Sequence, residues 1–243
     1  MGGFFVFSAE AQQIDKPDLI QSFPVGASPR GLAFDGANIW ITSDTIPNLT
    51  KLRASDGASL GTFPAGGKTA FAVFDGTYVW VTNLNDDTVS RLRASDGTLQ
   101  GTFPVGNFPY HIAFDGANIW AVNQFDGTVT KLRASDGAVL GSFNTGQSVV
   151  STPEGLAFDG VNIWVANGYD DTVTKLRASD GALLGTFTTG DFPNDVLFDG
   201  ANIWVVSFLD GTIAKLRPSD GALLGKRIVG NSLHGLAFDG NDV

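Results

Sequence analysis

The sequence contains no cysteine, which excludes a disulfide framework, a thiol nucleophile and a thiolate metal site. Histidine and glutamate are nearly as scarce, with two of each among 243 residues, so few side chains are available for acid–base chemistry. No apolar run approaches the roughly 20 residues that a membrane-spanning helix requires. We therefore expect no membrane insertion and no chemistry that depends on cysteine.

Basic residues are also in short supply, with 15 Lys and Arg against 25 Asp and Glu and a formal net charge of −10. Phosphate binding needs a basic surface, so we expect no nucleic-acid partner. Ten of the 15 basic residues recur in pairs at one place in a repeated pattern: Lys51/Arg53, Arg91/Arg93, Lys131/Arg133, Lys175/Arg177 and Lys215/Arg217. We interpret these pairs as solvated side chains that protect strand edges.

A short motif recurs along the chain and defines that pattern. Phe-Asp-Gly has its aspartate at positions 35, 75, 115, 159, 199 and 239, which are separated by 40, 40, 44, 40 and 40 residues. A tryptophan follows the glycine by four residues in the first five copies. With 43% hydrophobic residues the chain can also bury a core, so the period indicates a folded repeat protein.

The second copy shows how each repeat divides. Apolar or β-branched runs cover residues 71–74, 78–82, 88–93 and 98–104, and Asp-Gly ends the first and third of them. Asp-Gly between such runs is a strong hairpin signal. The fourth run often carries proline, as at Pro24, Pro64 and Pro104, which is typical of an edge strand. Each repeat is therefore predicted to form four antiparallel strands, with no helix.

A four-stranded unit repeated at about 40 residues predicts an all-β fold, a β-propeller. We expect a single propeller domain over residues 14–243, with repeats at 27–66, 67–106, 107–150, 151–190 and 191–230 and a partial repeat at 231–243. Tryptophan and phenylalanine are expected to fill the space between blades. Residues 20–26 match a fourth strand and residues 236–243 a first strand, which predicts an incomplete sixth blade. We favour a fragment of a six- or seven-bladed parent over a ring with a defective blade.

The first 13 residues do not resemble the repeats. Residues 2–7 are apolar, and Ser8-Ala9-Glu10-Ala11 offers the small residues of a signal-peptidase site. The basic residues that normally begin such a leader are missing, since Lys16 is the first one. We interpret residues 1–13 as the tail of a signal peptide, against the alternative of an odd apolar terminus. This predicts a secreted, periplasmic or cell-surface protein.

The repeats vary only in certain connections. The Phe-Asp-Gly and Ser-Asp-Gly turns are constant, whereas the connection between repeats and the loop between the second and third strands differ in every copy. In a propeller these two variable connections share one face, here called the variable face, and the two constant turns form the opposite, constant face. Recognition residues in repeat proteins concentrate where near-identical units differ. The candidate binding residues are Arg30, Phe71, Tyr110, His111, Phe125, Glu154, Tyr169, Asn194, Asp195, Phe208 and His234.

Two further expectations concern the variable face. The fourth connection carries four extra residues within 147–152 and should border any site. Asp86-Asp87 and Asp170-Asp171 offer oxygen atoms to calcium or magnesium, but aspartate is also a common turn former and no EF-hand spacing is present. We expect no cofactor, with calcium or magnesium as the alternative, and no catalytic residue is assigned.

The segments Gly155–Gly160, Val165-Ala166-Asn167 and Thr172–Leu176 resemble the YVTN-type propeller repeats of bacteria and archaea. That group is similar to the streptogramin lyases and the NHL-type propellers, and the resemblance extends over residues 20–243. It implies a propeller fold in a group that includes surface proteins, binding proteins and a few enzymes. Streptogramin lyases use a magnesium ion with His and Glu side chains, but His111 and His234 lie in no Glu-x-His motif. No lyase residue is therefore carried over.

Three functions follow from these observations. The favoured one is a non-catalytic secreted propeller that binds a protein, peptide or glycan on its variable face. The first alternative is a metal-assisted lyase or hydrolase that uses His111, Glu154, Asp195 and His234. The second is a structural module of a larger surface protein. Self-association through the incomplete blade is a further expectation.

Overall fold

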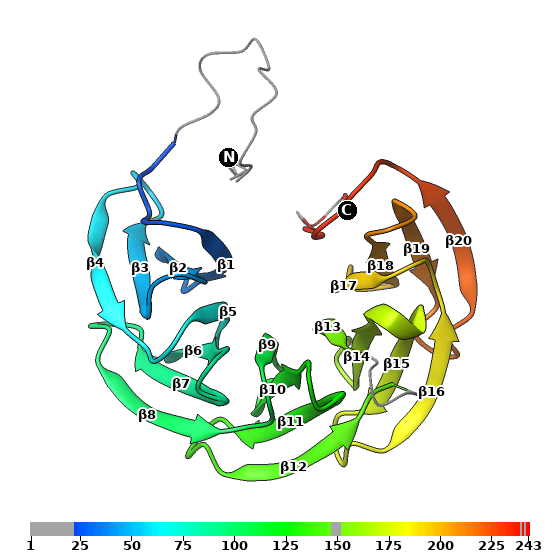
Figure 1. Cartoon of the computed structure of the whole chain (residues 1–243), viewed down its shortest axis with the longest axis horizontal. Coiled ribbons are helices and arrows are strands. Elements are labelled where there is room, and N and C mark those ends of the chain that lie inside the picture. The colour runs from blue at the N-terminus through cyan, green and yellow to red at the C-terminus, as the bar shows by residue number, and fades with distance from the viewer. Residues whose placement is uncertain (1–21, 147–151, 239, 241) are drawn as a thin grey trace.

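The computed structural model describes residues 22–146, 152–238, 240 and 242–243. The predicted signal peptide and all but Thr152 of the long fourth connection lie outside these ranges. Five four-stranded antiparallel sheets stand as blades around a common centre and leave an opening between the first and the last (Figure 1). The first strand of each blade lies near the centre and the fourth lies on the rim, so the chain is an all-β propeller.

Within each blade the strands pair in chain order. The strands are, in blade 1, β1 (Pro29–Phe34), β2 (Asn38–Ser43), β3 (Asn48–Arg53) and β4 (Ser59–Pro64); in blade 2, β5 (Thr69–Phe74), β6 (Tyr78–Asn83), β7 (Thr88–Arg93) and β8 (Leu99–Pro104); in blade 3, β9 (Pro109–Phe114), β10 (Asn118–Asn123), β11 (Thr128–Arg133) and β12 (Val139–Asn144); in blade 4, β13 (Pro153–Phe158), β14 (Asn162–Asn167), β15 (Thr172–Arg177) and β16 (Leu183–Thr188); in blade 5, β17 (Pro193–Phe198), β18 (Ile203–Ser207), β19 (Thr212–Leu216) and β20 (Leu223–Ile228).

The predicted strands of the second repeat are confirmed to within two residues at each end. Pro64 and Pro104 end rim strands, where a missing N–H donor does not interrupt a ladder. The prediction of no helix is wrong at one place, the short 3₁₀ turn η1 (Gly168–Asp170). Asp171 ends that turn with a φ of 54° and donates its N–H to the Gly168 carbonyl, 3.4 Å away.

The core lies between blades, as the repeat predicts. Trp40 is fully buried and packs with Val79, Val81 and Leu92 of blade 2, while Phe63 covers its ring at a centroid distance of 5.4 Å. Trp80, Trp120 and Trp164 are buried in the same way. Each blade therefore completes its core only against the next blade along the chain.

The aspartate of each Phe-Asp-Gly turn accepts a hydrogen bond from the tryptophan of its own blade. Trp120 Nε1 donates to Asp115 Oδ2 at 2.8 Å, and the other four pairs have distances of 2.6–2.8 Å. Burial raises the pKa of Asp115, but hydrogen bonds from Trp120, the turn amides and Asn118 outweigh it and leave the pKa lowered. The constant turn thus satisfies the one polar atom of a buried indole.

The paired basic residues divide into two roles. The second residue of each pair is an exposed arginine that pairs with the aspartate three residues later, as Arg133 does with Asp136 at 2.9 Å. The prediction of a solvated pair is wrong for the lysines, because Lys51, Lys131 and Lys175 are buried. Alternate residues of a strand point to opposite sides, and the lysine side is covered by the next blade. Lys131 Nζ donates to the Ala178 carbonyl of blade 4 at 2.6 Å.

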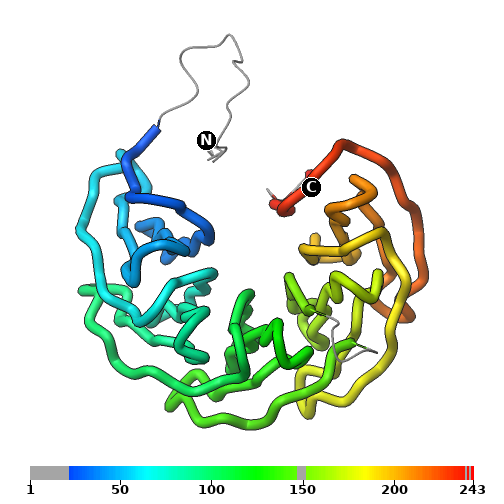
Figure 2. Tube along the Cα trace, viewed as in Figure 1, coloured from blue at the N-terminus to red at the C-terminus, as the bar shows by residue number. Residues whose placement is uncertain are grey.

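The incomplete sixth blade is not confirmed. Residues 22–28 and the described residues after Ile228 form no strand, since the two segments lie on opposite sides of the opening with no middle strands to pair with (Figure 2). Both flanks of the opening are left uncovered. Phe34 of β1 is 59% exposed, whereas its counterparts in blades 2–5 pack into inter-blade clusters.

In the parts of the chain that the structure describes, no helix is long and apolar enough to span a membrane.

Candidate functional site

The variable connections lie together on one face, as predicted. The loop after β6 bonds to the connection before β5, with Leu84 N donating to the Lys68 carbonyl at 2.7 Å. On the opposite face the two constant turns bond to each other, with Ala94 N donating to the Thr77 carbonyl at 3.1 Å. The same two couplings recur around the ring, so the variable and constant faces are physically separate surfaces.

A bulge in the first strand of every blade presents the candidate residues. The pairing of β1 with β2 is regular from Leu32 onward but skips between Pro29 and Leu32, which leaves Arg30 and Gly31 out of register. The corresponding irregularity occurs in blades 2–5. Bulges bend a strand and redirect its side chains, so the most variable positions of the repeat are the ones turned toward the centre.

The two faces also differ in backbone strain. Seven described residues other than glycine have a positive φ, and all lie in variable connections: Ser28, Asp87, Phe108, Thr152, Asp171, Phe192 and Ser232. On the constant face the corresponding conformations belong to glycines, for which they carry no strain. Strained non-glycine residues persist where the surroundings fix them, and they concentrate at functional sites.

The centre of the variable face holds a polar cluster drawn from three blades. Arg30 Nη2 donates to the Tyr110 hydroxyl at 2.7 Å, and its guanidinium lies 4.8 Å from the centre of that ring. Arg30 reaches past blade 2 because Ala70 is the residue at the corresponding position there. Arg30 also pairs with Asp44 at 3.2 Å. Glu154 of blade 4 lies close enough to Arg30 for the positive charge to oppose the rise that burial causes in the pKa of Glu154.

Two carboxyl groups at this centre are weakly acidic. Burial raises the pKa of Glu154 from 4.5 to about 7, against opposing contributions from Arg30 and a hydrogen bond from Gln124. Burial likewise raises the pKa of Asp195 to about 6, although it accepts hydrogen bonds from Leu236 N and Val196 N. A carboxyl group with a pKa near neutrality can donate or accept a hydrogen bond to a ligand near pH 7.

The raised pKa of Glu154 predicts that the stability of the protein depends on pH. A raised carboxyl pKa means that the folded state binds the proton more tightly, so this contribution is present below pH 4.5 and is lost as the pH rises to about 7. Glu154→Gln abolishes this loss of stability, because glutamine does not ionise. The melting temperature of the variant minus that of the natural chain should therefore increase between pH 4.5 and 7 and stay level above it. Asp195 titrates in both proteins, so its contribution cancels from the difference in melting temperature. A difference that stays constant between pH 4.5 and 7 contradicts the prediction.

Histidine 111 is held by aromatic contacts. Its ring lies 4.4 Å from that of Phe71, which also packs edge-on to Tyr110 at 5.1 Å. Burial lowers the pKa of His111 to about 4, so the imidazole is neutral at neutral pH. Among the described residues its buried Nδ1 has no hydrogen-bond partner. The ring therefore offers a neutral imidazole beside the polar cluster.

A second, aromatic cluster lies over blades 4 and 5. Phe192 contacts Tyr169 at a centroid distance of 5.2 Å and Phe208 at 6.3 Å, and Phe208 contacts His234 at 5.0 Å. Asn194 Nδ2 donates to the Leu233 carbonyl at 2.9 Å. On blade 3 the exposed ring of Phe125 stacks on Phe108 at 4.5 Å. The predicted residues thus fall into two clusters and one isolated pair.

Two aromatic residues of these clusters were not among the predicted set: Phe108 and Phe192. Phe108 and Phe192 precede the proline that begins β9 and β17, and a Phe-Pro pair at this place occurs in only these two repeats. This difference between the repeats could have been found in the sequence. The pairing of Arg30 with Tyr110 was not, because it depends on how the blades are arranged around the centre.

The aspartates of the loops satisfy backbone amides. Asp87 Oδ1 accepts from Phe108 N and Asp171 Oδ1 accepts from Phe192 N, both at 2.9 Å. These contacts hold the strained connections in place. In the parts of the chain that the structure describes, no group of three or more His, Asp or Glu residues is placed to hold a metal ion.

The sequence matches no protein-family model and no curated protein. The fold is similar to several solved structures. A streptogramin B lyase has a TM-score of 0.77 and 17% identity, with 91% of this chain and 76% of that chain covered. Virginiamycin B lyase from Staphylococcus aureus has a TM-score of 0.72 and 17% identity, with 86% and 73% covered. The hydrazine synthase of Kuenenia stuttgartiensis has a TM-score of 0.70 and 14% identity, with 87% and 68% covered. These likenesses establish a propeller fold.

Proposed function

We propose that this protein is a non-catalytic, exported propeller that binds a protein or peptide ligand on its variable face. The observation that carries the proposal is the cluster of Arg30, Tyr110 and Glu154, in which side chains from three blades meet at the residues where the repeats differ. Tyrosine and arginine are enriched among residues that dominate binding energy. A glycan is the remaining ligand class for this face.

A metal-assisted lyase or hydrolase has less support. That function needs His111, Glu154, Asp195 and His234 to converge, but the ring of His111 lies against Phe71 and that of His234 lies against Phe208. Glu154 and Asp195 do share a neighbour, since both contribute to raising the pKa of Tyr110, although burial is the largest cause. Their raised pKa values serve hydrogen bonding to a ligand as well as they serve catalysis.

Self-association is compatible with the same proposal. The flank at β1 exposes Phe34, and on the flank of blade 5 Trp204 is only partly buried. These flanks correspond to the two halves of the blade-to-blade contact that occurs four times inside the chain, with Arg227 in place of the phenylalanine that covers the tryptophan in blades 1–4. A structural role within a larger surface protein uses the same flanks and does not exclude binding at the variable face.

Selection from a random peptide library displayed on phage tests the binding function. Peptides selected on the natural chain should lose at least about thirtyfold in affinity when Tyr110, His111, Glu154 and His234 are exchanged for residues of other repeats, because each removes a contact at the centre of the face. The melting temperature should stay nearly unchanged at pH 4.5, where Glu154 is still protonated in the folded protein, since residues of these other types already occupy the equivalent positions in the fold.

The matched control is Val161→Ala, which places the commonest residue of the constant turn at an exposed position on the opposite face. Fluorescence anisotropy with a labelled peptide should give the same affinity for this variant as for the natural chain. Peptides that bind the exchanged variant as tightly as the natural chain would place the site elsewhere.

A further inference from the structure

The constant face departs most from the repeat in blade 2. Blade 2 carries Thr77 and Tyr78 where the other four blades carry Ala or Val followed by Asn, and it carries Arg91 where they carry Lys. These three departures are neighbours in space, because β6 pairs with β7 through Tyr78 and Arg93, and the Arg91 guanidinium lies 4.7 Å from the centre of the Tyr78 ring. The departures at Val161 in blade 4 and Pro218 in blade 5 are single residues, whereas those in blade 2 lie together.

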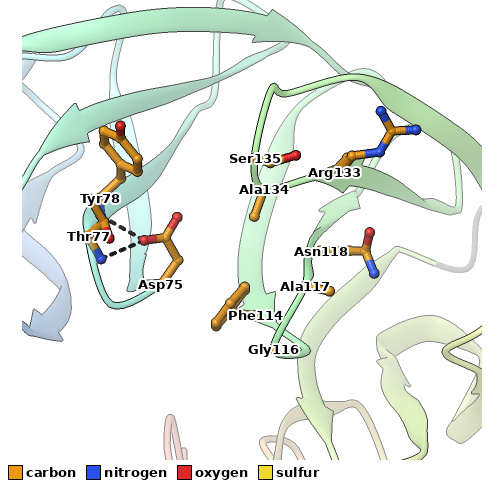
Figure 3. Close-up of a pocket in the computed structure, with 10 residues that line it drawn as sticks. All are labelled: Asp75, Thr77, Tyr78, Phe114, Gly116, Ala117, Asn118, Arg133, Ala134 and Ser135. Carbon is orange, nitrogen blue, oxygen red and sulfur yellow. Dashed lines mark hydrogen bonds between the residues drawn. The ribbon is translucent and has the colours of Figure 1, made fainter.

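An open cleft of about 570 Å³ lies at that place, between blades 2 and 3. Small-molecule sites commonly have volumes of about 300–1,000 Å³. Asp75, Thr77 and Tyr78 form one side of the cleft, and Phe114 and Ala134 lie on the other side (Figure 3). The first side carries a carboxylate and hydroxyl groups. The second carries the ring of Phe114 and the methyl group of Ala134, together with the polar side chains of Asn118, Arg133 and Ser135.

The departures leave the carboxylate of Asp75 open to a ligand. In blade 3 the side-chain amide of Asn118 donates to both oxygens of Asp115, at 3.2 and 3.0 Å, and Asn38 and Asn162 do the same in blades 1 and 4. Tyr78 supplies no such amide. Asp75 accepts hydrogen bonds from Thr77 N, Tyr78 N and Trp80 Nε1, and the place between its two oxygens that an amide fills elsewhere is not taken by residue 78.

Arg91 keeps the structural role of the lysine that it replaces. Its Nη1 donates to the carbonyls of Ala134 and Ser135 in blade 3, at 3.2 and 3.1 Å, much as Lys131 donates to Ala178 in blade 4. The contact between blades 2 and 3 therefore does not require arginine in place of lysine at position 91. In addition, the guanidinium supports the face of the Tyr78 ring. The lining of the cleft carries one carboxylate, that of Asp75, and one guanidinium, that of Arg133. The cleft as a whole suits an uncharged ligand.

We propose that this cleft binds a pyranose ring of a neutral glycan. A pyranose has an edge of hydroxyl groups, two of which can donate to one carboxylate, and an apolar face of C–H groups that packs on an aromatic ring. Asp75 and Thr77 match the hydroxyl edge, and Phe114 with Ala134 matches the apolar face. This site lies on the constant face, so it is separate from the proposed ligand site on the variable face and does not depend on it.

Saturation-transfer NMR with glucose, galactose, mannose and N-acetylglucosamine tests the proposal on the full chain. At least one of these sugars should receive saturation from the protein. The variant Thr77→Ala/Tyr78→Asn/Arg91→Lys restores the residues of the other blades and places an amide on Asp75. It should fold with an unchanged melting temperature and lose at least tenfold in affinity for that sugar.

Tyr110→Ala on the variable face is the matched control and should leave sugar binding unchanged. The proposal is overturned if none of the four sugars receives saturation, or if the restored variant binds the sugar as tightly as the natural chain. It is also overturned if methylammonium, a cation that satisfies a carboxylate without an apolar face, displaces the sugar fully at equal concentration.

Discussion

Replacement of Trp120 by alanine is expected to lower the free energy of unfolding by about 3–5 kcal/mol. The indole is fully buried between blades 3 and 4, where it packs with Leu156 and Ile163. Its removal leaves a cavity that rigid sheets cannot close, and it removes one of the two hydrogen-bond donors to the Oδ2 atom of Asp115. Thermal unfolding followed by circular dichroism measures the effect as a lowered melting temperature.

Trp204→Ala is the matched control for that experiment. Trp204 makes the same hydrogen bond to the aspartate of its turn, at 2.6 Å, but it is only partly buried because no further blade covers it. Arg227 also stands where the other blades place the phenylalanine that covers the ring. The loss of stability should be clearly smaller than for Trp120→Ala. Equal losses would mean that the tryptophan acts within its own blade and not between blades.

Gly137→Ala is expected to destabilise the chain by about 2–5 kcal/mol, which combines left-handed strain with overpacking. Gly137 has a φ of 78°, and a Cβ atom there meets the ring of Phe103 in the preceding blade. Phe103 cannot move freely, because it covers Trp80 at a centroid distance of 5.4 Å. The melting temperature reports the loss.

The control for this variant separates strain from steric conflict. Gly160 has a φ of 95°, and a Cβ atom there meets nothing within 4 Å. Gly160→Ala should therefore lose only the roughly 1–2 kcal/mol that a left-handed conformation costs a residue with a side chain. If the two variants lose the same amount, the contact between Phe103 and the turn of the next blade contributes little.

The architecture could be predicted because the same residues perform the same task in every blade. The aspartate of the turn, the tryptophan of the second strand and the glycine of the next turn recur at a fixed spacing, and this spacing identifies the strands. The separation of faces followed from the same comparison. Burial of Lys131 could not be predicted, because a lysine next to a strand end reads as solvated until the position of the following blade is known.

The candidate site was predictable as a surface but not as a set of contacts. Arg30, Tyr110 and Glu154 lie 80 and 44 residues apart in the chain, and only the arrangement of blades around the centre shows that they are neighbours. The sequence also contained a signal for the cleft on the constant face, but it lies outside the Phe-Asp-Gly and Ser-Asp-Gly turns. Tyr78 stands where four other blades have asparagine, two residues beyond the glycine of the turn.

The open ring has a consequence for how the molecule loses its structure. Each blade completes its core against its neighbours only, so stability is a sum of local contributions and not the property of one shared interior. Blades 2, 3 and 4 have a neighbour on both sides, whereas blades 1 and 5 have one each (Figure 1). Fraying from either end can therefore occur while the middle blades persist. The cleft on the constant face between blades 2 and 3 then belongs to the part of the chain that unfolds last. Arg30 on blade 1 belongs to a part that unfolds early.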